Sequence, residues 1–279
     1  MTTEGTDIHS ANLVDIVYGG RLPDVGDAAE DYVEASKLHR DAMGWDAPGV
    51  QFLEQTPAMH PVVARGYRGY ESRRAVRLPA PAEVTISLAE ACRRRRSANA
   101  LTDAGITLDE LSTLLRTAWE PVGSTGPRFG TQPRRPVPSA GALQPLDVWV
   151  VAHRVDGLPA GLYYARMPET GTAELVDMGP CDLQALAEAS LQPEIVGEAA
   201  VTLVVSAMPW RQRFKYGQRA LRFALIEAGH LVQTIQLVGS GIGLASRPLG
   251  GFVDDEVSRV VGLDGVDEVP LYVLPVGRG

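Results

Sequence analysis

Lysine is scarce in this 279-residue chain. Of its 26 basic residues only Lys37 and Lys215 are lysines, and the rest are arginines. Arginine stays charged in proteins, whereas a buried lysine can become neutral and act as a base. A genome rich in arginine codons would account for this bias without any functional meaning. The alternative is that the two remaining lysines are retained for their chemistry.

Basic residues are also fewer than acidic ones. The chain has 26 Lys and Arg and 34 Asp and Glu, which give a formal net charge of −8. This balance disfavours a general binder of the phosphate backbone, so we expect no nucleic-acid partner. The composition is 45% hydrophobic and 22% charged, as in globular proteins, and it excludes a chain that is disordered throughout.

Paired cysteines, clustered histidines and long apolar runs are lacking as well. The two cysteines, Cys92 and Cys181, lie far apart, which excludes a disulfide framework and indicates a reducing, cytoplasmic location. The five histidines are scattered without metal-binding spacing, so a protein metal site has no support. The first residues do not resemble a signal peptide, and no apolar run reaches about 18 residues, so no membrane span is expected.

Two prolines in the stretch RLPAPAEV, near residue 80, predict a boundary between an accessory region, residues 1–78, and a main domain, residues 79–279. In the accessory region a short helix is predicted over 31–43, followed by an extended, wrapping arm to Tyr70. In the main domain Ser87 and Thr107 each begin a capping box and therefore a helix. Residues 119–138 are rich in proline and glycine and are predicted to form a mobile lid.

Runs of β-branched and aromatic residues bounded by turn residues predict the strands, at 146–155, 162–165, 173–177, 200–207 and 269–276. The second and third of these are expected to form a hairpin. Apolar residues at helical spacing predict a long buried helix over 218–238, and a short helix is predicted over 255–261. The expected fold class is therefore α+β, with a helix-backed sheet.

Three segments carry residues suited to a flat, phosphorylated ligand. Arg93 to Arg96 precede Ser97, and forked donors beside a hydroxyl suit a phosphate monoester; cations that complement a helix C-terminus are the structural alternative. Small residues at 139–141 and glycines at 239–251 would allow close backbone approach, or form ordinary connections. The glycines end a helix instead of opening one after a strand, which disfavours a nicotinamide-binding Rossmann domain.

Lys215 and Tyr216 precede the long helix and lie among Arg211, Arg213 and Arg219. Crowded cations destabilise a protonated amine, so a lowered pKa would fit Lys215 for the role of general base. Tyr216 would then share the proton or orient the substrate. A solvated lysine beside a helix-capping aromatic residue is the structural alternative.

Six segments, in this order, resemble the nitroreductase superfamily: RRRRSANALTDAGITLDELSTLL, RPVPSAGALQPLDVWVV, GLYY, KYGQRALRFALIEAGHLVQTIQL, GIGLASRPLGGF and LYVLPVG. Within it they resemble the SagB-type dehydrogenases, which oxidise peptide thiazolines and oxazolines to azoles. The similarity spans about residues 80–279, and DYVEASKLHR resembles a recurring N-terminal element of this group. The resemblance implies an FMN-dependent α+β fold with a mostly antiparallel central sheet flanked by helices, a long buried central helix, and FMN at the interface of a homodimer.

The resemblance also implies roles for residues by position. Arg95 and Ser97 would hold the FMN phosphate, with Arg93 or Arg96 as helpers and Arg278 as a further candidate. The family often has a basic residue two positions after the serine, and this chain departs from it with Asn99. The expected flavin-facing residues are Pro138, Ser139, Ala140 and Gly141 from the partner subunit, and Gly241, Gly243 and Leu244 near the reactive edge. The Lys–Tyr pair of the azole-forming branch matches Lys215 and Tyr216 and is absent from ordinary nitroreductases.

The activity implied is that Lys215, assisted by Tyr216, removes a proton from an azoline ring in a peptide while hydride passes to FMN, which oxygen reoxidises. A cyclodehydratase is the implied partner. Three alternatives stay open. The chain could be an NAD(P)H-dependent reductase of nitro compounds or quinones, a flavin-binding structural subunit of a peptide-modifying complex, or a dehydrogenase of another amino-acid-derived or carrier-bound substrate.

Overall fold

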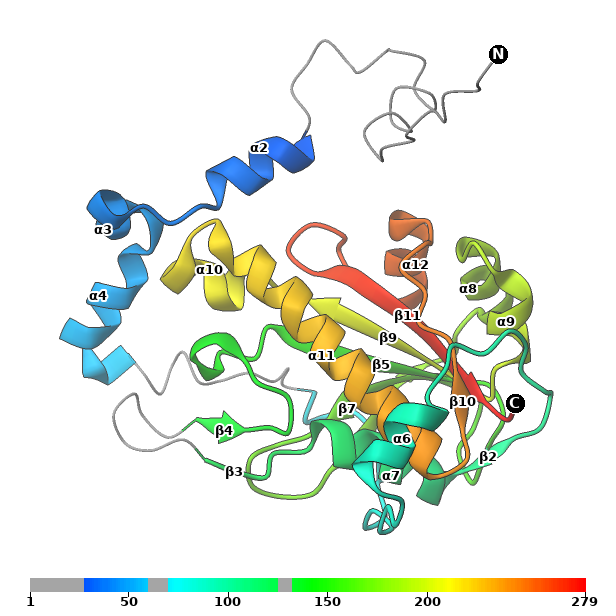
Figure 1. Cartoon of the computed structure of the whole chain (residues 1–279). Helices are drawn as coiled ribbons and strands as arrows, with labels where there is room; N and C mark the ends of the chain where they lie inside the picture. The colour runs from blue at the N-terminus through cyan, green and yellow to red at the C-terminus, as the bar shows by residue number, and fades with distance from the viewer. Residues whose placement is uncertain (1–27, 60–69, 125–131) are drawn as a thin grey trace, which may run out of the picture.

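A seven-stranded sheet forms the centre of the computed structural model, which describes residues 28–59, 70–124 and 132–279. Its strand order is β1-β8-β7-β5-β9-β11-β10, and every neighbouring pair is antiparallel (Figure 1). The strands are β1 (Ala75–Arg77), β5 (Leu146–Ala152), β7 (Gly161–Arg166), β8 (Glu174–Gly179), β9 (Val201–Ala207), β10 (Ala245–Ser246) and β11 (Val269–Gly277). The predicted strands and the hairpin of β7 and β8 are thereby confirmed.

The predicted strand 146–155 is too long at its end. β5 stops at Ala152 because the N–H groups of His153 and Arg154 both turn to the carbonyl of Ala200, at 3.0 and 2.8 Å. The chain then makes β6 (Val155–Asp156), which pairs in parallel with β2 (Ile106–Thr107). A third small sheet joins β3 (Gly123–Ser124) to β4 (Pro133–Arg134).

Helices cover both faces of the main sheet. Because side chains alternate along a strand, Val148 and Val150 of β5 pack in one core with α7 (Leu108–Trp119) and α11 (Arg219–Gly241). Trp149 and Val151 pack in the other core with α8 (Leu183–Ala189), α9 (Pro193–Glu198) and α12 (Asp254–Val261). The three layers confirm the expected α+β class with a helix-flanked antiparallel sheet, and α11 confirms the predicted long helix.

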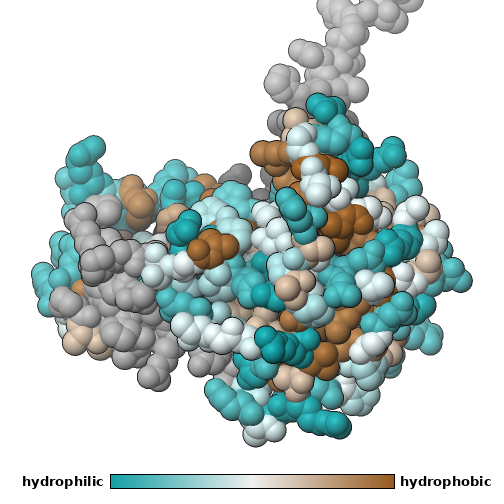
Figure 2. Space-filling view, turned by 90° about the horizontal axis from the view of Figure 1, so that it is seen from below, coloured by the Kyte–Doolittle hydropathy of each residue, from teal (hydrophilic) through white to brown (hydrophobic). Residues whose placement is uncertain are grey.

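Some apolar side chains stay on the surface of these layers. Figure 2 shows hydrophobic residues gathered on part of the underside of the molecule, among polar ones. On α11 itself, Leu225 and Ile226 remain 49% and 55% exposed. No helix in the described parts of the chain combines the length and apolar character needed to cross a membrane.

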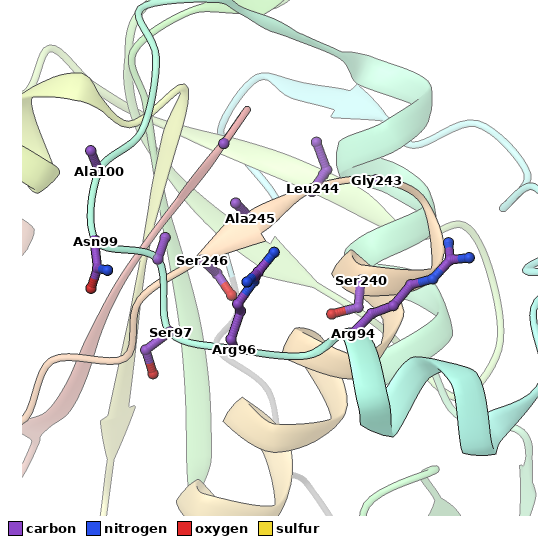
Figure 3. Close-up of a pocket in the computed structure, with 12 residues that line it drawn as sticks. Arg94, Arg96, Ser97, Asn99, Ala100, Ser240, Gly243, Leu244, Ala245 and Ser246 are labelled. Atoms are coloured by element: carbon purple, nitrogen blue, oxygen red, sulfur yellow. The ribbon is translucent and has the colours of Figure 1, made fainter.

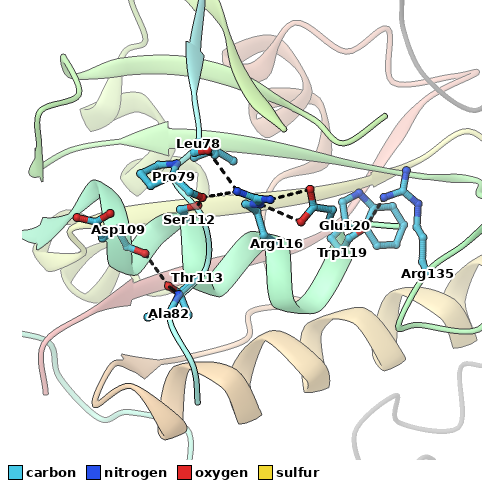
Figure 4. A network of polar contacts seen from close by, with 10 residues as sticks. All are labelled: Leu78, Pro79, Ala82, Asp109, Ser112, Thr113, Arg116, Trp119, Glu120 and Arg135. Atoms are coloured by element: carbon cyan, nitrogen blue, oxygen red, sulfur yellow. Dashed lines mark hydrogen bonds and ion pairs between the residues drawn. The ribbon is translucent and has the colours of Figure 1, made fainter. Parts of the chain in front are cut away.

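Helix α7 anchors the segment that leads into the main domain (Figure 4). Its start is the predicted capping box, in which the side chains and backbones of Thr107 and Glu110 bond reciprocally. Further along, Ser112 donates to the carbonyl of Pro79 at 2.6 Å, and Arg116 contacts the carbonyl oxygens of Leu78 and Pro79. Leu78 is buried, and β1 just before it joins the main sheet, so residues on both sides of the predicted boundary belong to one packed unit.

The N-terminal part differs from its prediction. The helix expected over 31–43 is α2 (Ala28–Ala35) and ends early, at Ser36. There the hydroxyl donates to the carbonyl oxygens of Tyr32 and Val33, and the residue accepts hydrogen bonds from Arg219 and Arg222 of α11. The following run is helical and not extended, since Pro48 at the first turn starts a helix. It comprises η1 (Arg40–Ala42), α3 (Met43–Asp46), α4 (Pro48–Gln55) and η2 (Pro57–Met59). The rest of the predicted arm, 60–69, and the middle of the predicted lid, 125–131, lie outside the described residues.

Candidate functional site

Lys215 and Tyr216 end a helix that the sequence did not predict, α10 (Trp210–Tyr216). Their side chains meet at Gly141, which has a φ of +61°. A β-carbon placed on Gly141 would lie 2.6 Å from the Tyr216 hydroxyl and 2.9 Å from the Lys215 Nζ. The Lys215 Nζ also lies 5.1 Å from the centre of the Tyr216 ring. The basic amine of Lys215 and the phenol of Tyr216 therefore face one small space, which is bounded by the backbone of Gly141.

The surroundings of the pair change how readily each group carries a proton. Burial lowers the pKa of Lys215, and the charge of Glu54 partly opposes that effect. Burial, followed by the charge of Glu227, raises the pKa of Tyr216. The lysine is therefore easier to deprotonate than an exposed one, while the tyrosine keeps its proton. The pair can accept one proton and donate one hydrogen bond.

The loop that carries Gly141 is held in an unusual conformation by a buried carboxylate. Ala142 and Gln144 also have positive φ, at 55° and 47°, which non-glycine residues adopt only when their surroundings enforce it. Oε1 of Glu227, on α11, accepts the N–H of Ala140 at 2.7 Å and the side-chain N–H of Gln212 at 2.6 Å. Burial raises the pKa of Glu227, although these hydrogen bonds act in the opposite direction.

A second polar cluster fixes the start of α10. Arg211 pairs with the buried Asp147 at 2.8 Å and donates to the carbonyl of Gln144 at 3.2 Å. Asp147, on β5, also accepts the Tyr164 hydroxyl at 2.9 Å. Arg211 and Gln212 thus tie the first turn of α10 to the sheet and to the Glu227 carboxylate that also holds the Gly141 loop, so the Lys215–Tyr216 pair follows directly on an anchored turn.

A separate cavity of about 470 Å³ lies at the other end of α11, between the segment after α6 (Leu88–Arg94) and β10 (Figure 3). Its frame is a short bridge, in which the N–H of Ala98 donates to the carbonyl of Ser246 at 2.9 Å and the Arg247 guanidinium donates to the carbonyl of Ala98 at 2.9 Å. Its polar and glycine lining residues are Arg94, Arg96, Ser97, Asn99, Ser240, Gly243, Ser246 and Gly279.

The cavity gathers only some of the predicted phosphate and flavin ligands. Arg96, Ser97, Asn99, Gly243 and Leu244 line it. The others lie around it: Arg95 caps α6, Arg93 pairs with Glu90 at 2.7 Å, Gly241 packs its backbone against Val84, and Arg278 binds Glu110 at 2.7 and 2.8 Å.

The residues of this cavity fit a phosphate-bearing group. Among the residues that the structure describes, no acidic side chain pairs with Arg96, and the Ser97 hydroxyl beside it is exposed. Gly243, with a φ of +77°, leaves open space where a side chain would stand. A free guanidinium, free hydroxyls and bare backbone are the donor set that a phosphate monoester and a flat ring system require.

The structure does not bring the two halves of the predicted site together within one chain. Pro138, Ser139, Ala140 and Gly141 lie on the loop at Lys215 and Tyr216, whereas Arg96 and Gly243 lie at the cavity. Phe223, whose ring contacts that of Tyr216 at 5.1 Å, and Ser240, which lines the cavity, are both on α11. At about 1.5 Å per residue they are about 25 Å apart along the helix axis.

Glu227 and Gln212 were not anticipated from the sequence. A signal for Glu227 was present, because this charged residue falls on the buried stripe of α11 with Ala224, Ala228 and Leu231. A carboxylate among core positions of a helix requires hydrogen-bond donors, and here the Gly141 loop and α10 supply them. Nothing in the sequence marks Gln212 as buried, because the helix that carries it is short.

Comparisons with known proteins agree with this architecture. The nitroreductase family model matches residues 92–278. The nitroreductase-like protein MJ1384 of Methanocaldococcus jannaschii is 31% identical over 195 residues, which are 69% of this chain and 91% of that protein. The microcin B17-processing protein McbC of Escherichia coli is 32% identical over 145 residues, which are 50% of this chain but only 53% of McbC.

Two solved structures show the same fold. A nitroreductase-like protein from Ralstonia eutropha superposes with a TM-score of 0.60 at 23% identity, covering 77% of this chain and 94% of its own. A chain of the Escherichia coli microcin synthetase complex McbBCD, with truncated pro-MccB17 bound, gives 0.57 at 21% identity and covers 92% of this chain and 99% of its own. With the family model reaching across both the arginine cavity and the Lys215–Tyr216 pair, this chain is a member of the nitroreductase family.

Proposed function

We propose that this protein is an FMN-dependent dehydrogenase that oxidises thiazoline or oxazoline rings in a peptide to the corresponding azoles. The observation that carries the proposal is the meeting of Lys215 and Tyr216 over the bare backbone of Gly141. Ring oxidation of this kind removes a proton from carbon, which calls for a positioned base, and Lys215 is one of only two lysines in the chain.

FMN would be held at the cavity by Arg96 and Ser97, with Asn99 and the bare backbone at Gly243 beside them. When bound, FMN supplies the acceptor for the hydride that leaves the ring. The cavity has the free cation and hydroxyls for the phosphate, while Arg93 and Arg278 are engaged by Glu90 and Glu110. We therefore assign the main phosphate contact to Arg96.

Lys215 performs the proton transfer. The neutral amine takes the ring proton on Nζ and becomes an ammonium, so the ring loses one hydrogen as a proton and one as hydride and gains a double bond. Burial favours the neutral amine before the step. The Tyr216 hydroxyl, which keeps its proton, donates a hydrogen bond to the substrate and so orients the reacting C–H bond.

A homodimer would complete the site. Within one chain the arginine cavity and the Lys215–Tyr216 pair lie near opposite ends of α11, about 25 Å apart by its rise per residue. A second copy packed along α11, where Leu225 and Ile226 are exposed, would bring the pair of one chain to the cavity of the other. The loop from Pro138 to Gly141 would then face the flavin of the partner.

A peptide substrate is supported by the similarity to McbC, which is named as processing microcin B17. The fold likeness to a chain of McbBCD, solved with truncated pro-MccB17 bound, agrees with it. Because azolines form by cyclisation of cysteine, serine or threonine side chains with loss of water, a cyclodehydratase must act before this enzyme and is a natural partner.

The test is to incubate the purified, FMN-loaded protein with an azoline-containing peptide and to follow the peptide by mass spectrometry. We expect each ring to lose the mass of two hydrogen atoms, and Lys215→Ala and Tyr216→Phe to slow that loss strongly. Full activity in both variants would remove these residues from the reaction. Rapid bleaching of the flavin by NADPH, with no change in any azoline peptide, would indicate a nitro or quinone reductase instead.

A further inference from the structure

Helix α4 packs against the backbone of α10 at Lys215. It does so although α4 lies outside the family match, which begins at residue 92. Gly49, buried in α4, touches α10 with its bare backbone. A β-carbon on Gly49 would collide with the carbonyl oxygen of Phe214 and stand 2.5 Å from the Cα of Lys215. Only glycine permits this approach, so α4 and the backbone of Lys215 share one fixed contact.

Further contacts hold the same N-terminal segment on α10 and α11. Gly217, with a φ of +52°, stands so close to α3 that a β-carbon would lie 2.7 Å from the Asp46 carbonyl oxygen. On α11, Arg222 donates to the Ser36 hydroxyl at 2.7 Å, and Arg219 donates to the Ser36 carbonyl at 3.2 Å. The N-terminal segment from α2 to α4 is therefore in contact with the end of α10 and with the start of α11.

Glu54 lies five residues beyond Gly49 on α4, about 7.5 Å further along the helix axis, and it is the charged group of α4 that acts on Lys215. Its side chain is exposed. The other charged or titratable groups on the elements packed around Lys215 are Asp46 on α3, Arg211, Arg213 and Tyr216 on α10, and Arg219, Arg222, Glu227 and His230 on α11. Of these acids, Asp46 is engaged by His39 and Glu227 by the Gly141 loop and Gln212.

We propose that α4 is a working part of the oxidation site: Gly49 sets the position of Lys215, and Glu54 is a positioning residue whose carboxylate stabilises the ammonium that forms there. This inference rests on the proposed function. During the step the proton moves from the ring carbon to Nζ of Lys215, while Glu54 takes no part in the proton transfer. Its effect is to set the pH at which Lys215 changes between base and acid.

The comparison of folds is consistent with a role for this segment. The chain from the McbBCD complex covers 92% of this chain, more than residues 60–279 alone could supply, whereas the Ralstonia eutropha protein covers 77%. Part of the N-terminal 59 residues thus has a counterpart in a peptide-processing assembly.

The first experiment uses the scarcity of lysine. The full-length protein is acylated briefly with acetic anhydride between about pH 6 and pH 11, and acylation of Lys215 and Lys37 is measured separately by mass spectrometry. Glu54→Gln removes the opposing charge, so we expect the midpoint for Lys215 to move to lower pH by a few tenths of a unit to about one unit. The midpoint for Lys37, which pairs with Glu34, should stay in place.

The matched control is Glu194→Gln, an identical change of an exposed glutamate on α9. It should leave both lysines unaltered. An unmoved Lys215 midpoint in Glu54→Gln, or an equal shift in Glu194→Gln, would overturn the role of Glu54. The labelling needs no azoline substrate, so it decides this point even if the unmodified protein oxidises no azoline, an outcome that would reject the proposed function alone.

The second experiment measures oxidation. Because the neutral amine is the base, activity rises with pH through the pKa of Lys215, and Glu54→Gln should move the acidic limb of kcat/KM to lower pH. Gly49→Ala should lower kcat at least about tenfold with FMN binding retained, whereas Gly44→Ala in α3, which has nothing within 4 Å, should not. Equal activity in folded Gly49→Ala would refute the positioning role; if that variant fails to fold, the Glu54→Gln profile still decides.

Discussion

Gly141 and Lys215 lie so close together that a single carbon added at position 141 would stand 2.9 Å from the lysine amine. The glycine also holds a φ of +61°, and it belongs to a loop fixed from α11 by Glu227. The bare position therefore serves two purposes, a backbone turn and an open space in front of the amine.

Gly141→Ala should disturb both the backbone turn and the open space in front of the lysine amine. The left-handed conformation costs a non-glycine residue about 1–2 kcal/mol, and the added methyl group would displace Lys215 and Tyr216. We expect a lower unfolding midpoint together with a strong loss of azoline oxidation. Gly157→Ala is the matched control, since its φ of +81° imposes similar strain with nothing within 4 Å. It should lose stability and keep activity; an equal loss of activity in both variants would contradict the contact at Gly141.

Lys215→Arg separates charge from proton transfer. Arginine keeps a cation at this position but does not release its proton at working pH. The variant should fold, bind FMN as before, and oxidise azolines about 10²–10⁴-fold more slowly. Flavin absorbance, thermal unfolding and peptide mass spectrometry read the three properties in one preparation. Lys37→Arg, at the other lysine, should behave as the unmodified protein does.

Glu227→Ala should loosen the Gly141 loop. It leaves the N–H groups of Ala140 and Gln212 without their acceptor in a buried place, which costs about 1–3 kcal/mol. Urea unfolding should show a lower midpoint with an unchanged slope. Glu227→Gln keeps one carbonyl oxygen as acceptor, so it should recover most of the stability. If the two variants were equally destabilised, the hydrogen bonds would not be the cause.

Arg96→Ala should weaken FMN binding by about tenfold or more, because one charge-assisted contact to phosphate is lost. Arg93→Ala, which removes a cation already engaged by Glu90, should change it little. Fluorescence titration of the apoprotein with FMN and with riboflavin measures both. The effect of Arg96→Ala should vanish with riboflavin, which lacks the phosphate, and a loss that is equal for both ligands would argue against a phosphate role.

The fold followed well from the sequence where local signals were strong. The valine-rich strands β5 and β9, the stripe of α11 and the capping box at Thr107 each depend on residues close together in the chain. The early end of α2 at Ser36 was missed because Arg219 and Arg222, far along the chain, favour the backbone geometry found there.

The sequence predicted which residues form the candidate site better than where those residues lie relative to one another. The predicted direction of the Lys215 pKa agrees with the structure, but burial lowers this pKa and the neighbouring arginines of the sequence do not. The position of the pair at Gly141 depends on Glu227 and Gln212, which hold the loop and α10. The arginine run looked uniform in sequence, yet Glu90 engages Arg93 and Arg94, and Arg96 alone of the run lines the cavity without an acidic partner among the described residues. Such distinctions come from tertiary contacts, which no local pattern contains.

The distance along α11 between the arginine cavity and the lysine has a consequence for a cell that makes two different mutant chains. In the proposed dimer each site draws its phosphate contacts from one chain and its base from the other. A chain lacking Arg96 and a chain lacking Lys215 would each form only impaired sites when assembled alone. Assembled together, they would place both lesions in one site and leave the second site intact, so two defective alleles would complement each other within a single cell.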